Sequence, residues 1–457
     1  MTINIHEDIP VSYSVDVVVV GGGPAGIGAA FMAARNGLNV LIIEQMNCLG
    51  GIASAGWHGH ICCYDTWNDK TRRIVGGTCW DLAEQVTRDG YGTYDGTHFE
   101  FEVEWFKYAV ETMAKAIGGI QILYYTQFSG VVMDGRNIDC LIIQNKSGRQ
   151  AVKAKIVIDC TGDADVAAKA GVPYEKGRPG DGAMQPMTLM FQMGGVDAEA
   201  FSQFQNHDYL TKYNVTERKG MEEVFLEAQR DGFMEPFQTR SMGWWWCATR
   251  PDQMGANFTH INHRDPTNTE DLTYATIEGR RQTFESIRVF NRYIPGLNDA
   301  WVSHTGALIG TRESRRIKGE YCITVDDLAQ QREFEDSIGY GSFFIDIHNC
   351  TGPGMDTETH YPDVGFHYQI PYRALVPMEV DNLLAAGRCI SCDHIALGSL
   401  RLMPQCFIEG DAAGAAAAIA LATGHSLRHI DTSLLQETLR KHGAIITSSD
   451  IVSQVFA

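Results

Sequence analysis

The chain has 457 residues, and 44% of them are hydrophobic, which is enough for one large domain or two interleaved domains around a sizeable core. Its formal net charge is −19, with 37 basic and 56 acidic residues. This balance disfavours nucleic acids and anionic membrane surfaces as partners, because both are bound through basic patches.

The N-terminal segment and the cysteines indicate the cellular setting. Residues 1–14 lack the charged and apolar regions of a signal peptide, and the apolar stretch near residue 415 is short and predicts a buried helix. The 12 cysteines follow no disulfide-framework spacing, so we expect a protein of the reducing cytoplasm. The sequence leaves the oligomeric state open, with a homo-oligomer as one option.

The stretch from Val15 to Glu44 predicts a unit that binds a dinucleotide. Val15–Val20 is an almost unbroken β-branched run, typical of a parallel strand buried on both faces. The glycines that follow fit G-x-G-x-x-G, which allows a tight turn, close approach to a pyrophosphate and close packing of helix on strand. We expect this turn to bind the cofactor through Gly21, Gly23, Ala25 and Gly26.

A helix over residues 24–36 and a strand over residues 38–43 complete the unit. The free N–H groups and the positive dipole end of the helix N-terminus favour a phosphate. Glu44 ends the second strand, where a carboxylate can accept hydrogen bonds from both ribose hydroxyls. The alternative is a glycine-rich turn in another kind of α/β protein, but here the strands, glycines, helix and acid occur in register.

The loop after Glu44 carries small residues and histidines. Gly50 and Gly51 would let the backbone pass close to a bound cofactor, although an ordinary flexible loop has the same composition. His58 and His60 lie in the same loop beside Trp57 and could flank a ligand. Loop histidines are more often solvated or hydrogen-bonded, so this interpretation is secondary.

Residues 98–118 have the spacing of a helix, and several short strands follow it. We expect these strands at 121–125, 131–133, 140–144, 151–153 and 156–159, with a hairpin turn at 145–148. The last strand runs into Thr161, Gly162 and Asp163, a small-residue turn where a backbone can pass the adenosine end of a dinucleotide.

Three groups of motifs resemble the FAD-dependent oxidoreductases of the glutathione-reductase-like flavoprotein superfamily. The first is the N-terminal fingerprint with its Gly50–Gly51 doublet, and the second is VIDCTGDADVA at residues 157–167. The third is a set of C-terminal stretches: LIGTRESRRIKGEYCIT, YQIPYRALVP and DNLLAAGRCISCDHIALGSLRLMPQCFIEGDAAGAAAAIA. Together the resemblance covers residues 15–60, 155–172 and about 300–425.

The resemblance implies FAD bound in an extended form, with its AMP end at the first strand. It places Gly387 and Arg388 near the phosphates or the ribityl chain. It also implies that GSLRLMP starts a helix whose N-terminus faces the flavin pyrimidine, where the helix dipole would stabilise negative charge on the reduced flavin. Cys392 departs from the pattern, which has a small residue such as alanine there. The cofactor-binding residues then include Ser399, Leu400 and Arg401, for which helix capping and a surface ion pair are the alternatives.

The predicted fold class is α/β: a Rossmann-like FAD-binding domain with a central parallel sheet and a β-meander, plus an inserted α+β substrate domain. We expect the FAD-binding domain to be discontinuous, over residues 1–172 and 375–457, with the insertion over 173–374. The insertion is rich in aromatic residues, including Trp244–Trp246, and contains a predicted long helix over 271–293. A small-residue helix over 404–421 and a helical appendage after about 430 complete the chain.

The sequence has one strand–G-x-G-x-x-G–helix unit, which disfavours electron entry from NAD(P)H through a second dinucleotide domain. We therefore expect the flavin to exchange a hydride directly with a small organic substrate at a C–O, C–N or C–C bond. The alternative is a flavoprotein that serves RNA modification or acts as an electron-transfer subunit. The charge of −19 argues against RNA, and no C-x-x-C-x-x-C cluster points to electron transfer.

The resemblance makes DNLLAAGR the second cofactor strand, and histidines and arginines in the segments before it are the candidates for catalysis. Histidine suits proton transfer near neutral pH, and arginine can clamp a carboxylate through two hydrogen bonds. The alternatives are structural histidines and a salt-bridge network that includes Glu313, Arg315 and Arg316. The histidine spacing is too irregular for a metal site, so we expect no metal. The candidate catalytic residues are His348, His360, His367 and Arg312, and Arg373 has a similar status to Arg312.

Cys389 and Cys392 form a C-x-x-C pair. They could be a redox dithiol beside the flavin, but packed thiols are the favoured interpretation.

Overall fold

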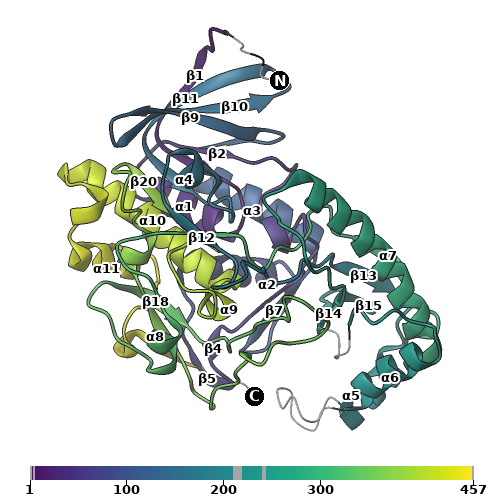
Figure 1. Cartoon of the computed structure of the whole chain (residues 1–457). Helices are drawn as coiled ribbons and strands as arrows, with labels where there is room; N and C mark the ends of the chain where they lie inside the picture. The colour runs from purple at the N-terminus through teal and green to yellow at the C-terminus, as the bar shows by residue number, and fades with distance from the viewer. Residues whose placement is uncertain (1–2, 4–5, 209–218, 239–242, 455–457) are drawn as a thin grey trace.

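A computed structural model describes residues 3, 6–208, 219–238 and 243–454 (Figure 1). Its centre is a seven-stranded sheet in the order β8-β2-β1-β11-β10-β9, with β20 paired to β11. The strands are β1 (Val11–Val20), β2 (Val40–Ile43), β8 (Ile120–Leu123), β9 (Gln127–Asp134), β10 (Asn137–Asn145), β11 (Gly148–Asp159) and β20 (Leu383–Ala385). The pairs β8–β2, β2–β1, β1–β11 and β11–β20 are parallel, whereas β9, β10 and β11 form an antiparallel meander. The predicted α/β class with a parallel central sheet and a meander is confirmed.

Strand β11 joins the parallel sheet to the meander. It pairs antiparallel with β10 at its start and parallel with β20 at its end, while β1 runs along its other side. The sequence predicts two strands here, but the structure has one: Lys153 and Lys155 continue it and direct their charges to Asp139 and Asp16. Exposed charged side chains interrupt the apolar pattern without interrupting the backbone pairing.

The two faces of the sheet are covered by different elements because side chains alternate along a strand. Val17 and Val19 of β1 belong to a core with helices α1 (Pro24–Arg35) and α10 (Met403–Thr423). Val18 and Val20 face the other way, toward the meander and helix α4 (Asp165–Lys169). The near-continuous apolar run of β1 is thus buried on both faces, as predicted.

Helices α1 and α10 pack closely through small residues. A Cβ on Gly410 would clash with the carbonyl oxygen of Ala25, and one on Gly414 would clash with that of Ala29. Helix α10 is long and apolar enough to be a candidate membrane span by length and composition, but 83% of its apolar window is buried inside the protein. A core helix passes the same test, and this burial explains the alanine-rich sequence.

A second sheet is antiparallel, in the order β14-β15-β13-β16, and lies with its helices on the right of Figure 1. Its elements are β13 (Phe191–Gly194), β14 (Gly243–Cys247), β15 (Arg250–Asn257), β16 (Trp301–Thr305), α5 (Ala198–Asp208), α6 (Lys219–Arg230) and α7 (Thr269–Tyr293). They share a core of their own around Phe191, Phe225 and Phe290. The predicted long helix is α7, and the side chain of Asn268 caps its N-terminus.

Smaller elements complete the described part of the fold. They are β3 (His60–Cys62), β4 (Asp65–Thr66), β5 (Asp69–Arg73), α2 (Gly77–Arg88), β6 (Gly92–Tyr94), β7 (His98–Phe101), α3 (Val103–Ile117), β12 (Tyr174–Lys176), β17 (Arg315–Ile317), α8 (Val325–Ala329), β18 (Ser337–Gly341), β19 (Tyr368–Pro371), α9 (Leu397–Leu400), α11 (Thr432–Lys441) and β21 (Val452–Ser453). Side chains of β18 and β19 belong to the core that contains α1 and α10, and not to the core of the antiparallel sheet.

The helix expected over residues 98–118 begins only at Val103. The preceding residues form β7, the central strand of a three-stranded sheet with β3 and β6. Phe99 and Phe101 are buried on one face of this strand and stack with a centroid distance of 4.9 Å. Strand pairing therefore outweighs the helical spacing that Phe101 shares with the residues after it.

Candidate flavin and substrate site

The G-x-G-x-x-G turn meets two other segments at the carboxyl end of β1. Gly21 has φ 97°, and a Cβ there would clash with the carbonyl oxygen of Cys160 at the end of β11. The N–H of Gly50 donates to the carbonyl oxygen of Gly22 at 2.8 Å. Because only glycine fits at position 21, the turn can pack directly against the end of β11. The hydrogen bond of Gly50 attaches the Gly50–Gly51 loop to the same turn.

Open space lies above the first turn of α1. A Cβ on Gly23 would meet only the Cα of Gly51, at 4.0 Å, and a Cβ on Gly26 would clash with the carbonyl oxygen of Gly21. Helix α1 begins at Pro24, and no side chain caps its N-terminus. Its first N–H groups and positive dipole end are therefore available to a phosphate.

Glu44 lies at the end of β2, as predicted. Its Oε2 accepts a hydrogen bond from the N–H of Gly22 and its Oε1 accepts one from the N–H of Met46, both at 2.7 Å. The residue is 6% exposed, and burial raises the pKa of the carboxyl group. Each oxygen has a second lone pair, so the fixed carboxylate can also accept from ribose hydroxyls.

The predicted residues of the second and third motifs come together beside this turn. Arg388 donates to Oδ1 of Asp163 and to Oγ of Ser314, both at 2.9 Å. Gly162 has φ 77° and lies against the guanidinium of Arg388. Thr161 donates to Asp159 from both its N–H and its hydroxyl, which shapes the turn.

The start of α10 contributes two polar residues that the sequence interpretation missed. Gln405 is fully buried, and neither its Oε1 nor its Nε2 has a partner within the described protein. Glu409 accepts from the N–H of Gly387 through Oε2 at 2.6 Å, whereas its Oε1 has no described partner. Burial raises the pKa of Glu409 well above its usual value. Gln405, Glu409 and Asp411 stand out in an alanine-rich helix, and this was the available signal; Asp411 is used by Thr78.

These features fit a dinucleotide cofactor. The uncapped helix end, the space above Gly23 and the fixed carboxylate of Glu44 match a pyrophosphate and a ribose. Unpartnered buried polar atoms beside Gly387 offer further hydrogen bonds.

The predicted cofactor residues at the end of α9 differ in their availability. Ser399 uses its hydroxyl with Phe343 and Tyr368, and the N–H groups of Ser399 and Leu400 both donate to Ala396. Neither residue has an N–H or a hydroxyl free of a protein partner. Arg401 is 10% exposed in its side chain, and its Nε has no described partner.

Arg401 leads into a cluster of charged side chains. Its guanidinium pairs with Oδ2 of Asp346 at 2.8 Å, and Nε2 of His348 lies 3.4 Å from the same carboxylate. Burial acts to raise the pKa of Asp346, but His348, Arg401 and Arg312 outweigh it and hold that pKa well below its usual range. Asp346 was not predicted, although it is two residues from His348.

Arg312 belongs to the same cluster. It is 6% exposed and donates to the carbonyl oxygen of Pro186 at 2.8 Å and to Oδ1 of Asn257 at 3.3 Å. Burial and the charge of Arg401 lower the pKa of Arg312 to about 9. The guanidinium therefore remains charged at neutral pH.

His348 faces a second buried imidazole, that of His260, at a centroid distance of 5.9 Å. The Nδ1 atom of each ring is buried and has no partner among the described residues, while Nε2 of His260 lies 2.9 Å from the carbonyl oxygen of Gly352. Burial, with Arg312 as a further cause, lowers the pKa of His348 to about 4 and that of His260 to about 3. Both rings are neutral at pH 7. No local pattern in the sequence singled out His260.

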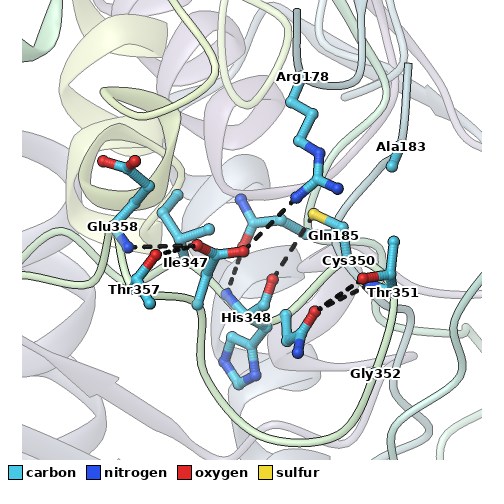
Figure 2. A network of polar contacts seen from close by, with 12 residues as sticks. Arg178, Ala183, Gln185, Ile347, His348, Cys350, Thr351, Gly352, Thr357 and Glu358 are labelled. Atoms are coloured by element: carbon cyan, nitrogen blue, oxygen red, sulfur yellow. Dashed lines mark hydrogen bonds and ion pairs between the residues drawn. The ribbon is translucent and has the colours of Figure 1, made fainter. Parts of the chain in front are cut away.

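Backbone hydrogen bonds hold the loop that carries His348 (Figure 2). The N–H of His348 donates to Oε1 of Gln185 at 3.2 Å, and its carbonyl oxygen accepts from the Cys350 thiol. The carbonyl oxygen of Ile347 accepts from the N–H of Asp356 at 2.8 Å. Figure 2 shows the imidazole of His348 pointing away from these contacts. The loop is fixed by its backbone, which leaves the ring available.

The Gly50–His60 loop also reaches toward this cluster. The N–H groups of Ala307 and Leu308 donate to the carbonyl oxygen of Ala55. The ring of His58 packs on Trp245 at 4.5 Å, and burial together with Arg312 lowers the pKa of His58 to about 4. His60 lies farther along, with its ring 5.2 Å from that of His98.

The other two predicted catalytic histidines have no side-chain hydrogen bond or ion pair with the cluster among the described residues. His360 is exposed, pairs with Ile345 through its backbone and borders a surface hollow of about 310 Å³. The Nδ1 of His367 lies 2.8 Å from the carbonyl oxygen of Gly365, and its ring packs against Tyr340. The structure brings His348 and Arg312 together but gives His360 and His367 no geometric support as catalytic residues.

The remaining arginines of the predicted basic cluster are in ion pairs. Arg315 pairs with Asp165, Arg316 with the fully buried Glu313, and Arg373 with Asp336. The structural alternative, a salt-bridge network, describes these three residues well. Arg312 is the exception.

Cys389 and Cys392 are buried, and burial raises the pKa of both thiols well above the usual value. All 12 cysteines are free thiols. This environment supports packed thiols over a redox dithiol, because the thiolate is the reactive form. Among the described residues, no three His, Cys, Asp or Glu side chains are grouped so that they could hold a metal ion.

The fold and the glycine-turn site define a dinucleotide-binding protein of the flavoprotein class. The sequence profile of the family described as FAD dependent oxidoreductase matches residues 16–439, so the chain belongs to that family. It is an FAD-dependent oxidoreductase, and FAD is its cofactor.

Similarity to individual proteins is more limited. The chain is 35% identical to thiamine thiazole synthase of Methanococcus aeolicus over 34% of this chain and 57% of that protein. It is 30% identical to digeranylgeranylglycerophospholipid reductase of Methanocella arvoryzae over 34% of this chain and 42% of that protein. The matches thus span about half the length of these relatives. A solved geranylgeranyl bacteriochlorophyll reductase-like protein of Thermoplasma acidophilum has a TM-score of 0.47 and 12% identity, over 94% of this chain and 82% of that one.

Proposed function

We propose that this oxidoreductase exchanges a hydride between its flavin and a small organic substrate, at a C–O, C–N or C–C bond, and that His348 handles the accompanying proton. We also infer that it falls within the glutathione-reductase-like flavoprotein superfamily. The observation that carries the proposal is the neutral imidazole of His348, whose side chain is 15% exposed, whose buried Nδ1 has no described partner and whose neighbour Asp346 pairs with Arg401 beside α9.

The chain's own residues would hold the cofactor at both ends. The N-terminus of α1 and the space above Gly23 suit the pyrophosphate, and Glu44 suits the ribose. Gln405 and Glu409 of α10 offer unused polar atoms to the other half of the cofactor. FAD, when bound, accepts or donates the hydride.

His348 is positioned for the proton by Asp346. In the tautomer that carries its hydrogen on Nε2, the ring donates toward Asp346 and leaves Nδ1 as a base. Nδ1 then takes a proton from a substrate O–H, N–H or C–H during oxidation, and it returns a proton during reduction. Burial keeps the ring neutral at pH 7, which is the protonation state that a base needs.

The proposal extends to domain roles and partners. Residues 1–172 and 375–457 would bind FAD, and residues 173–374, which carry Arg312 and His348, would bind the substrate. A small molecule is the proposed partner, with no nucleic acid or membrane, and the formal charge of −19 supports this. We further propose a cytoplasmic protein that can form a homo-oligomer.

A panel of small alcohols, amines and acids, mixed anaerobically with the holoenzyme, tests the proposal through flavin absorbance. The substrate so found should reduce the flavin of His348→Asn about 100-fold more slowly, with unchanged FAD content. The exposed His425→Asn serves as a matched control and should keep the rate. His360→Asn should behave like this control. An unchanged rate in His348→Asn would contradict the assignment.

A further inference from the structure

The cluster around Asp346 has an excess of positive charge. It contains the guanidinium groups of Arg312, which is 6% exposed, and of Arg401, whose side chain is 10% exposed, and one carboxylate, which pairs with Arg401 at 2.8 Å. The neighbouring Glu313 is already used by Arg316 and by His394. Among the described residues, Arg312 has no carboxylate within ion-pair distance.

A buried and unpaired guanidinium is an expensive arrangement for a protein. Arg312 is 6% exposed, and its hydrogen bonds go to the neutral oxygens of Pro186 and Asn257. By contrast, Arg316 is 1% exposed and has its full ion pair with Glu313. The protein thus neutralises Arg316 with its own carboxylate. Arg312 has no such partner among the described residues and is left for the charge of a ligand.

Unused hydrogen-bonding atoms surround the same place. Nε2 of Gln185 has no described partner, although its Oε1 accepts from the N–H of His348, which fixes the amide beside that residue. Nε of Arg401 is also unpartnered, as are the Nδ1 atoms of His260 and His348. Gln185 is 2% exposed, so its unused Nε2 lies in the interior of the protein. Both histidine rings are neutral and direct Nε2 toward an acceptor, so their Nδ1 atoms are acceptors and not donors. An anion would use Nε2 of Gln185 and Nε of Arg401 together with Arg312.

We propose that the substrate is a small organic carboxylate whose anionic group pairs with Arg312, with the amide nitrogen of Gln185 as part of its binding site. One excess positive charge matches a carboxylate better than a phosphate dianion, and the planar guanidinium fork fits two carboxylate oxygens. The role of this anion as substrate rests on the proposed hydride exchange, whereas its binding does not.

Titration of the FAD-loaded protein with acetate and with its neutral isostere acetamide tests the site, by calorimetry and flavin absorbance. Acetate should bind saturably, and acetamide should bind at least 30-fold more weakly. Arg312→Met should weaken acetate binding about 30-fold or more, and Arg312→Lys should weaken it less, because lysine keeps the charge but not the fork. Arg149→Met, at a half-exposed arginine on the meander, is the control.

The outcomes separate this inference from the proposed function. Equal binding of acetate and acetamide, or acetate binding that Arg312→Met and Arg312→Lys both leave unchanged, would overturn the carboxylate site. Tighter binding of inorganic phosphate than of acetate would overturn the assignment to a carboxylate. If acetate binds through Arg312 but no small molecule reduces the flavin, the anion site stands and the proposed hydride exchange fails. If the Arg312 variants lose FAD or their fold, acetate binding is compared between the unmodified protein and Gln185→Leu, which removes a neutral residue of the same site and should also weaken that binding.

Discussion

At the proposed cofactor half of the site, around the N-terminus of α1, single residues are already held in the position that a bound cofactor would need. Glu44 accepts two backbone hydrogen bonds, so its carboxylate is oriented before any ribose arrives. Gly23 has space where any other residue would place a side chain. A prearranged group of this kind loses little freedom when its ligand binds.

Glu44→Ala should weaken FAD binding by about 1–3 kcal/mol, because ribose hydroxyls would be buried without a partner. Gly23→Val should weaken it more, since its side chain would occupy the space above the first turn of α1. FAD content and the dissociation constant measure both effects. Glu104→Ala, whose side chain is 69% exposed, is the control. Equal FAD occupancy in all these variants would contradict the site.

Buried neutral histidines should make the protein sensitive to acid. The pKa of His260 is about 3 in the folded protein, compared with about 6.5 when unfolded. The unfolded chain therefore binds more protons in this range, and stability falls as the pH drops below about 6.5. Between pH 7 and pH 5 this group alone should cost about 2 kcal/mol.

The melting temperature should accordingly be lower at pH 5 than at pH 7, and His260→Gln should reduce the difference. His425→Gln, at an exposed site, should leave the difference as in the unmodified protein. A drop that is the same in all three proteins would show that His260 is not the titrating group. Asp346 acts in the same direction but only at lower pH, because its pKa lies below the usual range.

At the scale of elements, the contact between α1 and α10 sets the position of the cofactor helix. Glycines at positions 410 and 414 let α10 approach the carbonyl oxygens of Ala25 and Ala29. The same helix carries Gln405 and Glu409 to the site. Packing of these two helices thus determines where both halves of the cofactor can bind.

Gly410→Ala should push α10 away from α1 and cost about 1–3 kcal/mol of stability or more, as overpacking does. The variant should also retain less FAD, because α1 bears the pyrophosphate turn. Gly130→Ala in β9 is a matched control, since a Cβ there has nothing within 4 Å. Melting temperature and FAD content provide the measurements, and equal values for the two variants would contradict this packing role.

Elements with a strong local signal were predictable, and elements fixed by pairing were less so. The Gly21–Gly26 turn, Glu44 and α7 follow from glycine spacing, a strand end and helical periodicity. Periodicity predicts a helix over strand β7, because the pairing of this strand with β3 and β6 is a tertiary contact that periodicity does not report. The unbroken length of β11 likewise depends on its partner β1.

At the scale of the whole molecule, the two halves of the site differ in how they are encoded. The cofactor half uses motifs that are continuous in the sequence. The proposed substrate half joins His260, Arg312 and Asp346 from separate segments. A histidine in a loop, such as His360, looks the same in the sequence as His348. Only tertiary packing buries Nδ1 of His348 and leaves His360 exposed.

The molecule also has a single nucleotide fingerprint, which bears on its electron donor. Its second sheet, β13 to β16, is antiparallel in the described part of the chain and lacks the parallel βαβ geometry of a dinucleotide site. NAD(P)H should therefore reduce the flavin slowly. Anaerobic stopped-flow mixing measures the rate, with dithionite as the control that every flavin can be reduced. Bleaching by NADH or NADPH at ~10 per second, a typical turnover rate, would mean that a nicotinamide binds without such a domain and would make it the electron donor.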